Sequence, residues 1–236
     1  MSGAERSKSK GSRTEEFLGI RNGDLVAFIG GGGKSMLMDS IGRRLVKEGR
    51  KVLLAATRAW RLPENGAPTV FLTGEQPLGY LKAILGEHGI VALAPERSPE
   101  GLLLGYAPGA LQIFARMADY LFVEAEDAEG SSLPDPVGKR SIPVGTRVLL
   151  MVAGIDALGP DLDTTAFAKR LTAPDGILRC RPGLDRRILL LNKADRNSKR
   201  KDAALVAKKS LDLLGEGAPL PKVILTSVRD YLRPLA

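Results

Sequence analysis

The chain has 236 residues, of which 44% are hydrophobic and 26% are charged, and its formal net charge is +8. This composition is typical of a soluble globular protein, and the length suits one large α/β domain. The single cysteine excludes an internal disulfide, and one cysteine with one histidine argues against an all-protein zinc site in one chain. So few thiols fit a reducing compartment, and we expect a cytoplasmic protein.

Basic residues are concentrated in two polar segments. Residues 1–16 hold several of them among serines and glycines without an apolar period, so we expect a disordered basic tail before a single domain at 17–236. A second basic run covers 196–201. No aromatic residues interleave these runs, which argues against nucleic-acid binding. No apolar stretch reaches the roughly 18 residues of a membrane span.

In chain order, apolar runs predict strands at 25–29, 51–57, 69–72, 90–93, 120–123, 146–153, 187–191 and 222–227. Helical periodicity predicts helices that start after residue 35 and at 78, 108, 163 and 203, and that end near 48, 86, 119, 171 and 214. Alternating strands and helices indicate parallel pairing with right-handed crossovers. The predicted fold is therefore α/β and P-loop NTPase-like, with a mainly parallel sheet and helices on both faces.

The first strong motif is a glycine loop between the first strand and its helix. The apolar run at 25–29 leads into Gly30-Gly31-Gly32-Gly33-Lys34-Ser35 and then Met36. Glycines let several backbone N–H groups point at one anion, and the helix start adds partial positive charge. Lys34 is expected to reach the terminal phosphates and Ser35 to ligate Mg²⁺. Phe28 stands where the usual motif has its first glycine, so a glycine turn with a chance Lys-Ser is the alternative.

Acidic residues close the strand that begins at Tyr120. Carboxylates at Glu124 and Glu126 follow the buried run and can hold Mg²⁺ or orient a water. Thr57 ends an earlier strand at the same predicted edge, where ligands bind in open parallel sheets. The alternatives are solvent-facing acids at the one position and a solvated loop at the other.

The second strong motif is Asn192-Lys193-Ala194-Asp195, directly after a buried strand. In GTP-binding P-loop proteins an Asn-Lys-x-Asp motif recognises guanine. The aspartate accepts two hydrogen bonds from the base, the lysine stem covers the ring, and the asparagine braces the loop. An ordinary polar turn is the alternative.

With these motifs the chain resembles the YqeC family, whose members are described as accessory proteins of selenium-dependent molybdenum hydroxylases. The family's loop lacks the same early glycine. The resemblance covers roughly 24–227 and rests on the glycine loop, Ala56-Thr57, residues 118–125, residues 153–159 and Asn192–Asp195. After Ala125 the chain departs from the family pattern, with Glu126-Asp127 in place of Asp-Gly.

Motifs and resemblance together imply Mg²⁺-dependent binding of GTP, or of ATP, with slow hydrolysis in the maturation of a molybdenum hydroxylase or its cofactor. The client enzyme or its maturation proteins would be the partners. The implied catalytic residues are Lys34 and Glu126, and the implied metal ligands are Ser35 and Glu124. The implied nucleotide contacts are Gly30, Gly31, Gly32, Gly33, Lys34, Ser35, Met36, Thr57, Asn192, Lys193 and Asp195. A non-hydrolysing cofactor chaperone, or a kinase or nucleotidyl transferase acting on a small cofactor precursor, remain open.

Overall fold

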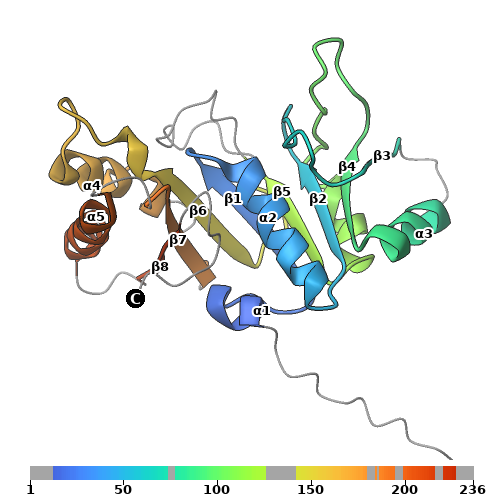
Figure 1. Cartoon of the computed structure of the whole chain (residues 1–236), viewed down its shortest axis with the longest axis horizontal. Helices are drawn as coiled ribbons and strands as arrows, with labels where there is room; N and C mark the ends of the chain where they lie inside the picture. The colour runs from blue at the N-terminus through green and yellow to red at the C-terminus, as the bar shows by residue number, and fades with distance from the viewer. Residues whose placement is uncertain are drawn as a thin grey trace, which may run out of the picture.

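A single parallel sheet forms the centre of the molecule. The computed structural model describes residues 13–73, 78–125, 142–179, 184, 186–194, 199–215 and 220–226. The sheet has eight strands in the order β3-β4-β2-β5-β1-β6-β7-β8 (Figure 1). Their bounds are β1 Asp24–Gly30, β2 Val52–Ala56, β3 Thr69–Phe71, β4 Ile90–Ala94, β5 Tyr120–Glu124, β6 Val148–Gly154, β7 Arg186–Asn192 and β8 Lys222–Leu225. Each neighbouring pair is parallel, which confirms the predicted α/β fold of the P-loop NTPase type.

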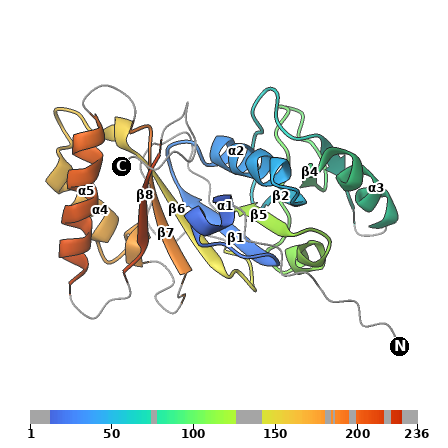
Figure 2. The same ribbon diagram turned by 60° about the horizontal axis from the view of Figure 1, so that its bottom comes forward.

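Helices cover both faces of the sheet, as predicted. Side chains alternate along β1, so Val26 and Phe28 pack with α2 whereas Ala27 and Ile29 pack on the opposite face. The first face carries α1 (Arg13–Leu18) and α2 (Lys34–Lys47). The second carries α3 (Leu78–His88), η1 (Ala110–Arg116), η4 (Ile177–Arg179), α4 (Thr164–Thr172) and α5 (Lys199–Leu214), the last two side by side (Figure 2). None of the described helices is long and apolar enough to cross a membrane.

Two local predictions need correction. The helix predicted at 108–119 is a shorter 3₁₀ helix, η1, that covers Ala110–Arg116. The helix predicted from Ala203 begins at Lys199, so the end of the basic run at 196–201 is helical. In both segments the apolar pattern predicts a helix correctly. It does not predict the 3₁₀ geometry of η1 or the start of α5.

The predicted disordered tail overlaps a helix. Residues 13–16 belong to α1, whereas residues 1–12 lie outside the described part of the chain. Glu15 is buried, accepts a hydrogen bond of 2.6 Å from the Tyr120 hydroxyl, and lies 2.7 Å from the guanidinium Nε of Arg50. Burial, and secondarily this contact with Glu15, raises the pKa of Tyr120 far above its ordinary value. A charged residue in a polar tail is thus fixed to the core by tertiary contacts.

The register of the sheet brings the predicted motifs to one edge. Central strand β1 lies between β5 and β6, with Phe28 opposite Glu124 and Gly30 opposite Val152. The pairing of β6 with β7 places Gly154 opposite Asn192. Because all strands are parallel, the loops after β1, β5, β6 and β7 leave from the same carboxyl edge. Open parallel sheets bind their ligands at this edge.

Candidate nucleotide site

The loop after β1 follows a path that only glycine can take. Gly30 and Gly32 have φ angles of 97° and 85°. A Cβ atom at Gly30 would lie 2.1 Å from the Val152 carbonyl oxygen, and one at Gly32 would lie 2.5 Å from the Gly154 nitrogen. The Gly31 N–H donates to the same Val152 carbonyl at 3.0 Å. The loop is therefore packed against the end of β6, and it is not a loose glycine turn.

The start of α2 leaves backbone donors for an anion. Gly33 is the N-cap residue, and no side chain caps the first turn. The first N–H groups of a helix have no partner within the helix, and with the helix dipole they favour negative charge. These groups lie directly after the glycine loop. Loop and helix start thus form one cradle that suits a phosphate group.

Lys34 and Ser35 both contact Glu124. The Lys34 side chain is only 4% exposed, and its ammonium donates to the Gly30 carbonyl at 2.6 Å and lies 3.6 Å from the Glu124 carboxylate. The Ser35 hydroxyl donates to the other oxygen of that carboxylate at 2.7 Å. Three residues predicted from two separate motifs are therefore in contact. A serine hydroxyl beside a carboxylate oxygen is a set of oxygen donors of the kind that Mg²⁺ prefers.

The Asn-Lys motif reaches the glycine loop from the other side. Asn192 ends β7, is buried, and its amide nitrogen donates to the Gly32 carbonyl at 2.7 Å. The hydrogen bond joins the end of β7 to the glycine loop. The backbone after β7 is itself fixed, because the Ala194 N–H donates to the Thr226 carbonyl at 3.0 Å.

Asp156 is a member of this group that the sequence did not single out. It lies in η3 (Ile155–Ala157), directly after β6, and its carboxylate accepts from the Lys193 ammonium at 2.6 Å. Lys193 has a φ of 62°, an uncommon value for a residue other than glycine. The available signals were its position just after a buried strand and its place within residues 153–159, which resemble the family pattern.

Two buried polar atoms at the same place lack partners among the described residues. They are Oδ1 of Asn192 and the hydroxyl oxygen of Thr226. Buried polar side chains normally have at least one hydrogen-bond partner.

Of the remaining predicted residues, one contacts Glu124, one is partly exposed on α2, and two lie outside the described residues. Thr57 contacts Glu124 through its backbone N–H, 2.9 Å from the Glu124 carbonyl oxygen, and its hydroxyl lies 3.4 Å from that oxygen. Met36 lies in the first turn of α2 and is 46% exposed. Glu126 and Asp195 fall outside the described residues, so their predicted roles remain predictions.

One comparison identifies the family. A family model described as "YqeC protein" matches residues 26–170, which is more than half of the chain. The chain belongs to the YqeC family. The matched range contains the glycine loop, Thr57, Glu124 and Asp156, and it ends before Asn192. A search of curated proteins gave no match.

This YqeC-family chain also resembles several solved structures at low identity. They include hydrogenase maturation factor HypB from Archaeoglobus fulgidus (13% identity, 92% of this chain and 87% of that chain, TM-score 0.44). HypB from Helicobacter pylori in complex with nickel shares 16% identity over 92% of this chain and 84% of that chain, with a TM-score of 0.46. An apo GTPase from Pyrococcus abyssi shares 12% identity over 88% of this chain and 91% of that chain, with a TM-score of 0.45. At such identities and TM-scores, these similarities carry no information about ligand or function.

The close packing of the loop can be tested with an alanine pair. Gly32→Ala combines a positive φ with overlap against Gly154, and we expect it to lower the free energy of unfolding by about 2–4 kcal/mol. Gly19→Ala is the matched control, because Gly19 has a φ of 70° but an added Cβ there would have no atom within 4 Å. It should cost only about 1–2 kcal/mol. Urea denaturation measures both. Equal losses would show that contact with β6 does not constrain the loop.

Proposed function

We propose that this protein binds a nucleoside triphosphate with Mg²⁺ at the Gly30–Ser35 loop, prefers GTP to ATP, and hydrolyses it slowly. The observation that carries the proposal is the contact of Lys34 and Ser35 with Glu124 beside the glycine loop. A positive side chain, a hydroxyl, a carboxylate and free helix N–H groups are the parts that Mg²⁺–phosphate binding requires. They come together here at the carboxyl edge of a parallel sheet.

Each phosphate-binding residue has a defined task in this proposal. The loop N–H groups hold the phosphate oxygens. Lys34 leaves the Gly30 carbonyl and neutralises charge on the terminal phosphates. Ser35 and Glu124 would hold Mg²⁺, whose charge would neutralise the phosphate oxygens. Glu126 positions the attacking water.

The proposed preference for GTP rests on the motif after β7. Asp195 pairs with the guanine N1–H and exocyclic amine, which adenine does not offer. Lys193 covers the base, with its ammonium held at Asp156. The Asn192–Gly32 hydrogen bond supports this assignment, because it fixes the base-recognition loop to the phosphate loop.

The proposed biological role follows from the family. We place this nucleotide cycle in the maturation of a selenium-dependent molybdenum hydroxylase or of its cofactor. The client enzyme, or the proteins that mature it, would read the nucleotide state.

Phosphate binding can be tested at Lys34. Lys34→Ala should weaken Mg²⁺–GTP binding by at least about tenfold, because it removes charge-assisted contacts to the phosphates. Lys47→Ala, at the exposed end of α2, is the matched control and should bind like wild type. Isothermal titration calorimetry gives both affinities. Unchanged binding by Lys34→Ala would remove the loop from the nucleotide site.

Base recognition can be tested at Asp195. Asp195→Asn should lower GTP affinity by about 1.5–3 kcal/mol, because a charged acceptor is lost, while ATP affinity stays the same. The exposed Asp212 of α5 supplies the control variant Asp212→Asn. Competition titrations with both nucleotides make the comparison. Wild-type protein that binds ATP as tightly as GTP would rule out guanine selection.

Hydrolysis can be tested at the two glutamates. Glu126→Gln should lower GTP turnover by on the order of 100-fold with little change in GTP affinity, as for loss of a group that positions or activates water. Glu124→Gln should raise the Mg²⁺ concentration at which GTP binding is half-maximal. Glu96→Gln, an exposed glutamate after β4, is the control. Full turnover in both site variants would show that these acids take no part in the reaction.

A further inference from the structure

A cleft opens at the same edge of the sheet as the glycine loop. Its volume is about 490 Å³, and it lies between the segments that leave the carboxyl ends of β2 and β4. Polar lining comes from Arg61, Glu64, Thr69 and Arg97. Two guanidinium groups against one carboxylate give the cleft a positive balance. No residue of the nucleotide site described above lines it.

One of the two arginines is already oriented by its surroundings. The Arg97 guanidinium lies 5.8 Å from the centroid of the Phe71 ring and 3.4 Å from the Gly101 carbonyl oxygen. Both Arg61 and Arg97 have exposed side chains, so solvent anions can reach them. A guanidinium held on an aromatic face keeps its outward N–H groups ready for a phosphate or carboxylate.

The walls of the cleft are joined to each other. Trp60 and Leu103 exchange two backbone hydrogen bonds of 2.9 Å, which tie the segment after β2 to the segment after β4. Gly105 lies so close to this connection that an added Cβ would be 2.3 Å from the Arg58 nitrogen. The cleft is therefore a formed site between two fixed segments.

The cleft is also joined to the nucleotide site through α2. The buried carboxylate of Asp39 accepts from the Ala67 N–H at 2.9 Å, and Arg43 donates to the Asn65 carbonyl at 2.7 Å. Both residues lie on the helix that Lys34 begins. A second connection runs from Thr57, at the start of the cleft segment, to the Glu124 carbonyl oxygen.

We propose that this cleft binds a small molecule that carries a phosphate or carboxylate group. It would be the second ligand of the site, bound beside the nucleotide, and only that pairing rests on the proposed function. Guanidinium groups recognise such oxyanions through charge-assisted, bidentate hydrogen bonds.

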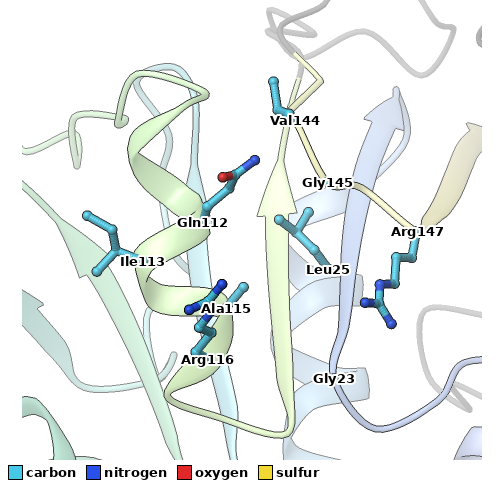
Figure 3. A pocket seen from close by; sticks show the side chains of 9 residues that line it. All are labelled: Gly23, Leu25, Gln112, Ile113, Ala115, Arg116, Val144, Gly145 and Arg147. Carbon is cyan, nitrogen blue, oxygen red and sulfur yellow. The ribbon is translucent and has the colours of Figure 1, made fainter.

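A cavity at the opposite edge of the sheet supplies matched controls. It has a volume of about 540 Å³ and is lined by Leu25, near the start of β1, and by two exposed arginines. Figure 3 shows these, Arg116 on η1 and Arg147 just before β6, on either side of that cavity. They match Arg61 and Arg97 in type and exposure but lie away from the proposed ligand edge.

The experiment is an amide NMR titration of the full chain, first with inorganic phosphate and then with malonate. Gly66 and Gly101 report on the cleft, while Gly30–Gly33 report on the nucleotide loop. We expect saturable shifts at the cleft with phosphate, malonate or both, and the anion that binds identifies the group. The cleft shifts should persist in Lys34→Ala. Arg61→Gln and Arg97→Gln should each weaken the cleft affinity at least about tenfold, whereas Arg116→Gln and Arg147→Gln should leave it unchanged.

Two results would overturn the proposal. One is the absence of cleft shifts with both anions, and the other is an unchanged cleft affinity in Arg61→Gln and Arg97→Gln. A third titration, with Mg²⁺–GTP, tests the nucleotide site in the same way. Absence of shifts at Gly30–Gly33 in that titration, with cleft shifts still seen with phosphate or malonate, would count against the nucleotide site alone. The two sites therefore fail separately.

Discussion

The end of β6 leaves no room for a side chain at Gly30 or Gly32, and this close approach fixes the course of the loop after β1. The other contacts at the carboxyl edge of the sheet depend on the course of this loop. The loop carbonyls are the acceptors for Lys34 and Asn192, and the loop delivers the chain into α2 with its first N–H groups uncapped. If the loop were displaced outward, its contacts with Lys34 and Asn192 would be lost at the same time. The missing early glycine therefore matters less than the packing of the glycines that are present.

Parallel pairing then assembles a site from distant segments. Residues 30–35, Glu124 and Asn192 are far apart in sequence, and strand register alone brings their loops together. Side chains alternate between faces with a period of two, so a one-residue slip of β5 would turn Glu124 away from Ser35. Both β1 and β6 are buried along their whole length, as strands covered on both faces are.

Sequence patterns predicted the parts of this arrangement that are local. Continuous apolar runs identified the strands, and Gly30–Ser35, Glu124 and Asn192 followed from short motifs at strand ends. The sequence did not reveal α1, because its burial depends on the contact of Glu15 with Arg50 and Tyr120, both distant in sequence. Asp156 was missed for a similar reason. Its partner Lys193 belongs to another strand end, and only the sheet brings the two together.

The arginine cleft could not be predicted, since it requires two irregular segments to meet. Its connection to α2 has a thermodynamic consequence that the fold imposes. Asp39 lies five residues after Lys34, or about 7.5 Å along the helix, so the two residues belong to one rigid element, α2. A ligand that shifted the first turn of α2 would act on the Asp39–Ala67 hydrogen bond at the wall of the cleft. Linkage is reciprocal. A ligand in the cleft would therefore change the affinity for nucleotide by the same factor by which nucleotide changes the affinity for that ligand. A helix that begins at the glycine loop and holds one wall of the cleft would in this way couple the two proposed ligands.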